Sequence, residues 1–536
     1  MVAVPHLGGT PPPSSTVGGT VTKAGDFCLR IRMIREKKDV FVLELPLKTT
    51  AAQEKVLLKR FEAARQVYNA CLGETLRRHA LLKQSKAYSE AIAMPKQDKK
   101  ARSLSFRNAM LAVGFTEYDM MHWATQFTTS WLRDHIASQE VKALVSRAFQ
   151  AVERYHYGTG KPCKTLRYCP KKKKNCYSCC RPKFKRYGDM QSVNNITNLQ
   201  GLRWREETNS VQWRDLIISA ITDPCDPVQS HGLSHEVKYI RIMKRTLKGL
   251  LRFYVQLTLG GLPLQRTPVA KGCLVGIDIG PSSIAAYDGS RAFLQEFCAG
   301  VEDKSREIRR LQRKLDRQRR ANNPDCYDEK GRAIKGKHPT NKSNHMAQTE
   351  AKIAEIERQL AAHRKSLQGQ MVNTLLAMGN VVQTEKLSIK AWQKIWGKSV
   401  KKHAPGTFMQ LLRTKTAASG GEVREFSTYT TALSQTDHMT GKREKKSIGQ
   451  RWHYFEDGTK VQRDLYTAFL AFCVDTETDT LNEDLANRLW ACGAGSLLAA
   501  AFEEVRQLAS SGATVPACFG LGQRQSESAA SQNEHD

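Results

Sequence analysis

Apolar positions recur with the two-residue period of a β-strand in some parts of the chain and with the longer period of a helix in others. Residues 27–34 and 40–45 read as strands and predict an opening β element. Thr50-Ala-Ala-Gln53 then has the pattern of a helix capping box. The helix that it starts carries one apolar stripe, made of Leu57, Phe61, Ala64, Tyr68 and Cys71.

The helical pattern continues to residue 155, interrupted by a basic run at 96–102. Trp123, Phe127 and Trp131 recur at every fourth position, and we expect this stripe to be core, with a stacking surface for nucleic acid as the alternative. Strand patterns return at 202–204, 211–213, 237–242 and 253–257. They are predicted to complete the β element opened at residue 26, with the helices inserted between.

Residues 158–187 combine cysteines with cations. Cys176-x-x-Cys179 supplies half of a zinc-binding pattern, and Cys163 and Cys169 complete it at a looser spacing. The alternative is a set of unliganded cysteines in a solvated basic loop. The cations are expected to contact phosphate, although the run also resembles a nuclear import signal; they include Lys171, Lys172, Lys183, Lys185 and Arg186.

A run of apolar residues beginning at Cys273 ends in a lone acid, Asp278, followed by Gly280. Asp288-Gly289 is a two-residue hairpin turn between strand patterns at 284–287 and 292–297. An antiparallel meander whose first strand ends in Asp begins ribonuclease-H-like folds and also actin-like ATPases. This stretch alone therefore leaves both open.

Residues 303–378 predict a long helical hairpin, whose first helix has an apolar stripe at Ile308, Leu311 and Leu315. Its other faces carry many more arginines than acids. We expect them to track a phosphate backbone rather than to form only a solvated face. The arginines assigned to this surface are Arg309, Arg310, Arg313, Arg317 and Arg320.

Two further acids follow at the ends of predicted elements. Glu385 ends a short strand, and Asp464 lies in the first turn of a helix that comes after a strand at 422–426. Singly, each acid has a structural explanation, such as a strand-end turn, a surface charge or a helix N-terminal charge. Together they follow the ribonuclease H order, in which the three acids converge at one sheet edge and hold two magnesium ions, or manganese, for phosphodiester hydrolysis.

The composition of the chain indicates how many domains to expect and what kind of partner the protein binds. The 536 residues exceed one core, so at least two domains are expected. A net charge of +32 indicates a polyanionic partner, and nucleic acid is the first candidate. The sequence has no apolar run long enough to span a membrane. Fourteen cysteines without a recognisable signal peptide favour a reducing, cytoplasmic location.

Three motifs resemble the RuvC motifs of the TnpB/type V CRISPR effector superfamily: Gly276-Ile-Asp278-Ile-Gly280, Thr384-Glu385-Lys-Leu387 and Gln462-Arg463-Asp464. Residues 47–69 also resemble the opening helix of that family. The resemblance implies an α+β multidomain protein with a RuvC nuclease domain of ribonuclease H-like fold, a β-barrel-like wedge domain and an inserted helical recognition domain. The expected bounds are a disordered N-terminus (1–25), wedge (26–48 and 184–262), recognition domain (49–157), Cys-rich segment (158–183), RuvC domain (270–427 and 461–475), insert (428–460) and a C-terminal helical appendage with a disordered tail (476–536).

The resemblance further implies a guide RNA and a double-stranded DNA target with a short flanking motif, bound by a prokaryotic protein that acts as a monomer with one RNA. The implied function is RNA-guided DNA endonuclease. Two alternatives remain: an RNA-guided DNA-binding protein that cleaves weakly or not at all, and an actin-like or sugar-kinase-like ATPase. An ATPase of this kind would need a further Gly-rich phosphate loop, and no convincing one follows in the sequence.

The insert departs from the family pattern. Family members carry a zinc ribbon there, but its four cysteine positions are occupied by Asp437, Thr440, Tyr454 and Asp457. The sequence therefore predicts an insert without zinc, either held by packing and polar contacts or mobile.

Overall fold

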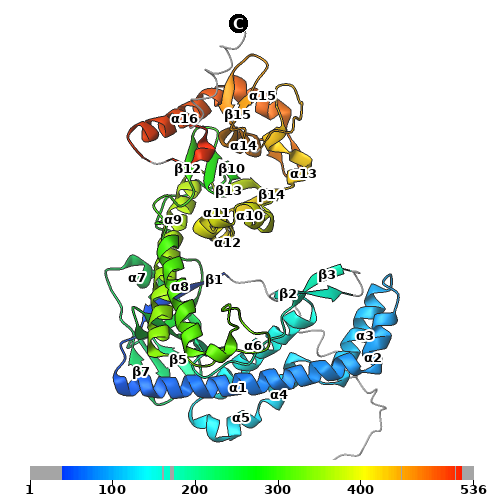
Figure 1. Cartoon of the computed structure of the whole chain (residues 1–536), viewed down its shortest axis with the longest axis vertical. Helices are drawn as coiled ribbons and strands as arrows, with labels where there is room; N and C mark the ends of the chain where they lie inside the picture. The colour runs from blue at the N-terminus through cyan, green and yellow to red at the C-terminus, as the bar shows by residue number, and fades with distance from the viewer. Residues whose placement is uncertain (1–38, 160–161, 170–173, 448, 514, 522–536) are drawn as a thin grey trace, which may run out of the picture.

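The computed structural model describes residues 39–159, 162–169, 174–447, 449–513 and 515–521, and between 160 and 179 it describes the backbone of two strands only. The described chain is a mixture of α and β with several separate sheets. Figure 1 shows the N-terminal half as the lower part and the C-terminal half as the upper part, with the paired helices α8 (Ser305–Asn322) and α9 (Asn344–Met378) running between them.

A four-stranded antiparallel sheet in the order β1-β9-β8-β4 forms the base of the N-terminal half. Its strands are β1 (Val40–Pro46), β9 (Leu250–Gly260), β8 (Val237–Leu247) and β4 (Ser192–Asn194). A three-stranded sheet lies beside it, made of β5 (Leu202–Arg205), β6 (Ser210–Trp213) and β7 (Leu216–Ser219). The short helix α7 (Pro227–Leu233) follows β7 in the chain. Of the predicted strands, β9 pairs with β1 and β8 joins the same sheet, whereas those at 202–204 and 211–213 belong to the separate sheet of β5, β6 and β7. The strand expected at 27–34 lies outside the described residues.

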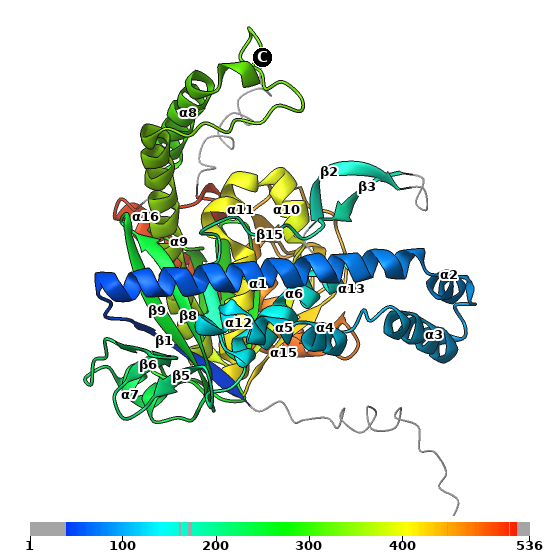
Figure 2. The ribbon, with the colours of Figure 1, turned by 90° about the horizontal axis from the view of Figure 1, so that it is seen from below.

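The long helix α1 (Ala51–Gln84) begins at the predicted capping box. Gln53 N–H donates to Thr50 Oγ1 (3.3 Å), and Thr50 N–H donates to Gln53 Oε1 (2.9 Å). The predicted stripe is buried and packs against α6 (Ser138–His156). Figure 2 shows α1 crossing the molecule, with α2 (Lys86–Ala93) and α3 (Lys99–Ala112) at its far end.

The aromatic stripe at 123–131 is only partly core. Trp123 ends α4 (Glu117–Trp123) and meets Phe127 of α5 (Gln126–Thr129) edge-on, with ring centroids 5.4 Å apart, against the core. Trp131 begins a separate 3-10 turn and is 61% exposed, so its core assignment is wrong. The cause is local: three short helices replace one, and the four-residue period no longer keeps one face.

A five-stranded sheet in the order β12-β11-β10-β13-β14 forms the C-terminal half. The central strand β10 (Leu274–Ile279) pairs antiparallel with β11 (Ser283–Tyr287) and parallel with β13 (Val381–Glu385). The outer strands are β12 (Ala292–Glu296), antiparallel to β11, and β14 (Glu422–Phe426), parallel to β13. The meander, the later strand ending in Glu385 and the strand at 422–426 are all confirmed.

Helices cover both faces of this sheet. One face packs against α9 and α12 through Val275, Ile277 and Phe408, among others. The opposite face packs against α14, and α16 joins the same core through Leu498, Phe502 and Val505. The helices are α8 (Ser305–Asn322), α9 (Asn344–Met378), α10 (Ile389–Ile395), α11 (Gly397–His403), α12 (Pro405–Ala418), α13 (Thr428–Thr431), α14 (Arg463–Phe472), α15 (Glu483–Ala491) and α16 (Ala494–Ser510). No helix of the described residues has the length and apolar character needed to cross a membrane.

Helix α14 approaches β10 closely at Gly276. A Cβ built on Gly276 would lie 2.3 Å from both the carbonyl oxygen of Ala468 and the backbone nitrogen of Phe472. Those atoms are backbone and cannot rotate aside. Residue 276 must therefore be glycine if the helix is to lie this close to the strand.

We predict that Gly276→Ala separates α14 from β10 and lowers the free energy of unfolding by about 1–3 kcal/mol, as overpacking does in other cores. Gly369→Ala is the matched control, because Gly369 lies inside α9 and its Cβ would meet nothing within 4 Å. That control should be neutral or stabilise by about 0.5–1 kcal/mol. Urea denaturation of the full chain measures both, and equal midpoints for the two variants would contradict the prediction.

Candidate active site

Two of the predicted acids lie on neighbouring parallel strands. Asp278 is the penultimate residue of β10, and Glu385 is the last residue of β13. Ile277 is paired with Thr384, so Asp278 and Glu385 are the next pair along the ladder. Because side chains alternate along a strand, both carboxyl groups leave the sheet on the same face. This is the face that Gly276 presents to α14.

The third acid, Asp464, comes from the first turn of α14. Gln462 caps this helix, its Oε1 accepting the Leu465 N–H at 2.9 Å. From the Gly276–Ala468 contact, Asp278 lies two residues on, about 7 Å along the strand. Asp464 lies four residues before Ala468, about 6 Å along the helix. The helix therefore carries Asp464 to the same end of the sheet as Asp278.

Burial and mutual repulsion raise the pKa values of these acids. The Asp278 pKa is raised well above its ordinary value, first by burial and then by the negative charges of Asp464 and Glu385. Burial raises the Glu385 pKa to about 7. Burial also raises the Asp464 pKa, against the opposing effects of Arg463 and of the Ser283 hydroxyl, which donates to Asp464 Oδ2 at 3.1 Å. Asp278 and Glu385 are partly exposed to solvent, whereas Asp464 is buried.

The donor set fits a divalent cation in its chemistry. Carboxylate oxygens suit magnesium, and a cation between them would offset the repulsion that raises the Asp278 pKa. The carboxyl groups are close enough to interact, but no group of three or more His, Cys, Asp or Glu side chains in the described ranges is arranged as a ready metal-binding cluster. The three predicted acids thus lie near one another, but their side chains are not positioned as a complete set of metal ligands.

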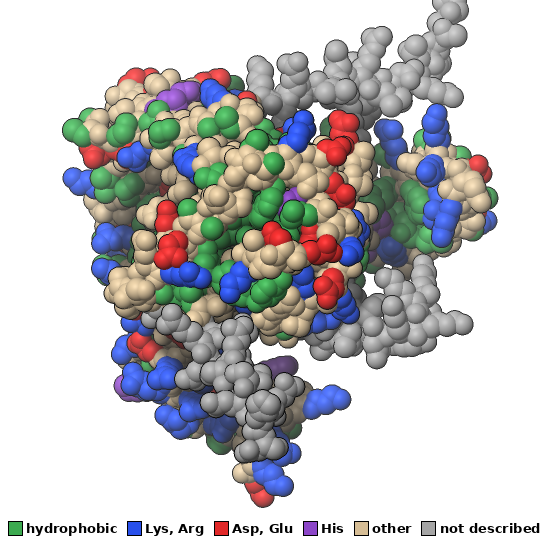
Figure 3. All heavy atoms as spheres, turned by 90° about the horizontal axis from the view of Figure 1, so that it is seen from above, with side chains coloured by type: hydrophobic (Ala, Val, Ile, Leu, Met, Phe, Trp, Pro, Cys, Tyr) green, Lys and Arg blue, Asp and Glu red, His purple; other side chains and the backbone are tan. Residues whose placement is uncertain are grey.

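The predicted phosphate-contacting residues fall into two groups. All five predicted arginines of α8 are exposed, and four of them line a hollow of about 340 Å³ together with Arg306. In Figure 3, Lys and Arg side chains gather on the parts that project at the lower left and at the right, which correspond to the α8–α9 hairpin and to α2–α3.

The second group lies near residue 185. Lys183 and Arg186 are exposed, and Lys171 and Lys172 lie outside the described residues. Lys185 is anchored instead: its carbonyl accepts hydrogen bonds from Arg65 and Asn69 of α1, and its ammonium lies 5.4 Å from the Tyr68 ring centroid. Sequence reasoning did not anticipate that this lysine packs on a helix.

The four predicted zinc ligands belong to a β-hairpin of β2 (Pro162–Cys169) and β3 (Lys174–Cys179). Its register pairs Pro162 with Cys179 and Arg167 with Cys176. The side chains of Cys163, Cys169, Cys176 and Cys179 lie outside the described residues, so their role as zinc ligands stays a prediction.

The insert that lacks the ribbon cysteines has a buried polar centre. Asp437, His438 and His453 are all at least nine-tenths buried. Asp437 Oδ1 accepts the Met439 N–H (2.9 Å), and its Oδ2 lies 3.3 Å from His453 Nε2. Lys446 contacts the other ring nitrogen of His453. Asp437, at a position where the ribbon of the resembling family has cysteine, thus fixes a turn and lies beside His453.

Aromatic packing completes this centre. His453 stacks on Tyr466 of α14, with centroids 4.5 Å apart, and His438 Nδ1 shares a 2.7 Å hydrogen bond with the Tyr466 hydroxyl. Phe455 and Trp490 pack on the same group. The insert is therefore held by packing and polar contacts, the first of the two predicted alternatives. His438 and His453 each adjoin a position where the ribbon of the resembling family has cysteine, and their burial against Tyr466 was not predicted from the sequence.

We predict that the insert loses stability as the pH falls. Burial lowers the His438 pKa to about 4 and also lowers the His453 pKa. An unfolded histidine titrates near 6.5, so between about pH 6.5 and 4 the unfolded insert binds protons that the folded one excludes. Hydrogen exchange, corrected for its intrinsic pH dependence, should show residues 436–455 losing protection between pH 7.5 and 5.5 while α1 does not. Unchanged protection of the insert at pH 5.5 would refute this.

Comparison of the sequence with known proteins does not assign this chain to a family. No model of a protein family matches the chain, and no curated protein matches it. Similar solved structures include a Cas12f1–sgRNA–target DNA complex, at 11% identity over 80% of this chain and 98% of that chain, with a TM-score of 0.36. Another is a CRISPR–Cas12f ternary complex, at 11% identity over 78% of this chain and 81% of that chain, with a TM-score of 0.24. At these scores the likeness carries no argument, and the functional assignment rests on the residues of the site.

Proposed function

We propose that this protein is an RNA-guided DNA endonuclease with a RuvC-type active site at Asp278, Glu385 and Asp464. The observation that carries the proposal is the convergence of these acids, from two parallel strands and one helix, in the order that the RuvC motifs lead one to expect. The five-stranded sheet with the acid-bearing strand at its centre supports a ribonuclease H-like domain.

Asp278, Glu385 and Asp464 would hold the two magnesium ions, or manganese, which supply the positive charge that activates a water and stabilises the leaving oxygen of a phosphodiester. The chain itself orients the third ligand. Ser283 donates to Asp464 Oδ2, and Arg463 Nε lies 3.8 Å from the other carboxylate oxygen. These contacts limit the rotation of Asp464 before any ligand arrives.

The nucleic acid partners follow from charge. The exposed arginines Arg309, Arg310, Arg313, Arg317 and Arg320, with Lys183 and Arg186, form surfaces suited to phosphate. We assign them to a guide RNA and a double-stranded DNA target with a flanking motif, bound by one chain with one RNA. The sheets of the N-terminal half would serve as a wedge domain, and the helices at 49–157 as a recognition domain.

Two other functions explain fewer of these observations. An RNA-guided protein that binds without cleaving leaves the burial of three converging acids without a use. An actin-like or sugar-kinase-like ATPase has no need of a net charge of +32 or of an arginine hairpin.

We expect Asp278→Asn, Glu385→Gln and Asp464→Asn each to lower DNA cleavage by more than about 100-fold, since each removes a metal ligand. Guide RNA binding should persist, and the unfolding midpoint of Asp278→Asn should equal or exceed that of the wild type, because asparagine removes the repulsion by Asp464 and Glu385. Asp325→Asn, at an exposed acid outside the site, is the control.

The assay uses protein purified with its own RNA, sequences that RNA to choose the target, and follows plasmid cleavage with and without magnesium. Wild-type rates from any of the three active-site variants would remove that residue from the site. Cleavage that needs no divalent cation would remove the metal mechanism.

We further propose that the Cys-rich hairpin binds zinc and that the insert does not. Elemental analysis of protein stripped of adventitious metal should find about one zinc per chain. Cys176→Ser combined with Cys179→Ser should abolish it, whereas Asp457→Ala, at an exposed position of the insert, should leave it unchanged. Zinc that survives loss of both cysteines would overturn the assignment.

A further inference from the structure

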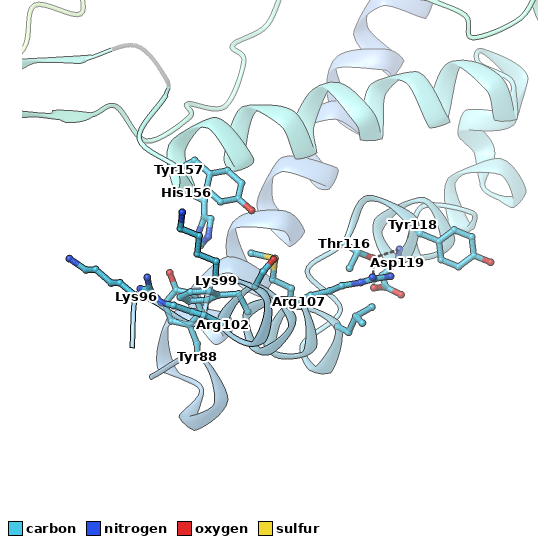
Figure 4. Close-up of a pocket in the computed structure, with 14 residues that line it drawn as sticks. Tyr88, Lys96, Lys99, Arg102, Arg107, Thr116, Tyr118, Asp119, His156 and Tyr157 are labelled. Carbon is cyan, nitrogen blue, oxygen red and sulfur yellow. Dashed lines mark hydrogen bonds between the residues drawn. The ribbon is translucent and has the colours of Figure 1, made fainter. Parts of the chain in front are cut away.

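A cavity of about 960 Å³ lies between α2, α3, the start of α4 and the end of α6. None of the assignments above uses it. Figure 4 shows residues of these elements around it, with Tyr157 and His156 on one side and Tyr118 and Asp119 at the far end. Its volume is at the upper end of the roughly 300–1,000 Å³ range of small-ligand sites. That volume admits a nucleotide, whereas a duplex is too wide for it.

Part of the lining is an aromatic cluster. Tyr88 is buried, with its ring centroid 5.4 Å from that of Phe106 and 6.0 Å from that of His156. Burial lowers the pKa of His156 to about 4, so this ring is neutral at physiological pH. His156 Nδ1 is also within 3.2 Å of His79 Nε2, which fixes the ring in place. The Lys83 ammonium lies 4.4 Å from the Tyr88 ring centroid and donates to the Tyr88 hydroxyl at 2.6 Å, so the cluster combines aromatic rings with a cation beside them.

Cations surround this aromatic surface. Lys96, Lys99 and Arg107 are exposed, and within the described part of the chain none of them forms an ion pair. Arg102 lies over the Phe106 ring at 5.4 Å and donates Nε to the Ala91 carbonyl at 3.3 Å, which holds its guanidinium at the cavity. These four cations face a single acid of the lining.

That acid is already engaged. Asp119 accepts a hydrogen bond from the Thr116 hydroxyl in the cap of its own helix, drawn as a dashed line in Figure 4. Four lysine and arginine side chains around an apolar surface, with one occupied carboxylate, favour an anionic ligand that also has an apolar part.

Two exposed tyrosines complete the lining. Tyr157 is 60% exposed and Tyr118 79% exposed, although tyrosine rings are usually more buried. Tyr157 meets His156 edge to face, at 4.8 Å between centroids, and this contact supports its ring without covering both faces. A supported ring with an open face beside cations is the arrangement on which unpaired bases stack.

We propose that this cavity binds an unpaired nucleotide of a single strand, with its base stacked on Tyr157 and its phosphates held by Lys99, Arg102 and their neighbouring cations. The proposal rests on the proposed function only for the origin of the strand, which is either guide RNA or DNA displaced from the target. A purely apolar ligand would leave the cations without a partner, and a free inorganic anion would leave the aromatic surface unused.

The test uses the full chain, freed of co-purified RNA by high salt and nuclease. Short single-stranded oligonucleotides containing 4-thiouridine or 4-thiothymidine are photocrosslinked to it, and the crosslinked peptides are mapped by mass spectrometry. Crosslinks are expected in peptides containing Phe106 or Tyr157. Tyr157→Ala should reduce them at least about fivefold, since loss of one stacking ring has effects of that size. The RNA and DNA arms identify the source of the strand.

Tyr429→Ala, at a 93% exposed tyrosine on α13, is the matched control and should leave crosslinking at the cavity unchanged. Lys99→Ala with Arg102→Ala should weaken crosslinking and reduce its salt dependence, because fewer counterions are released. Absence of crosslinks from these peptides, wild-type crosslinking by Tyr157→Ala, or crosslinking to duplex alone would each overturn the proposal.

The cleavage assay separates this inference from the proposed function. Crosslinks at the cavity without cleavage that depends on Asp278 would leave the nucleotide site standing and refute the nuclease. Cleavage that depends on Asp278 without such crosslinks would do the reverse.

Discussion

The contact between α14 and β10 at Gly276 is the constraint on which the C-terminal half depends. With no side chain at this position, the backbone of Ala468 and Phe472 lies where a Cβ would otherwise be. The same helix carries Asp464 at one end and, through Tyr466 and Phe469, one wall of the insert at its side. A single close approach therefore fixes the third acid relative to the first two and gives the insert a surface to fold on.

The acids of the site are costly to keep together. Burial disfavours each charge, and the charges of Asp464 and Glu385 disfavour that of Asp278 further. Within the described residues, Arg463, Ser283, Arg451 and Gln462 oppose this effect at Asp464, and Arg463 and the Ile279 N–H oppose it at Asp278. A site arranged in this way is more stable with protons or cations bound than empty, so affinity for a cation and instability in its absence have the same physical origin.

The sequence predicts the sheet well because its signals are local. The apolar run before Asp278 and the capping box at Thr50 each specify their own element, and the structure contains both. The hairpin predicted at Asp288-Gly289 also forms, but four residues, 288–291, connect its paired strand ends instead of two. The convergence of the acids also follows from the order of elements. Trp131 was misassigned because its exposure depends on where short helices break, which the four-residue spacing does not reveal.

Sequence reasoning could not predict the features that depend on contacts between residues far apart in the chain. His438 and His453 are buried against a tyrosine on α14, and nothing next to them in the chain announces that contact. The cavity at α3 joins residues from 88 to 157, and its aromatic surface and cations are interpretable only once α6 lies beside α2. The four proposed zinc ligands and the strand at 27–34 remain predictions, because the side chains of the former and all residues of the latter lie outside the described part of the chain.

The buried polar and aromatic centre of the insert has a consequence for the order of folding. A zinc ribbon organises its own short segment around an ion, but this insert shares its core with Tyr466, Phe469 and Trp490, all of which follow it in the chain. During synthesis it cannot complete its core until residue 490 has emerged from the ribosome. Its assembly is thereby coupled to that of the five-stranded sheet on which α14 packs.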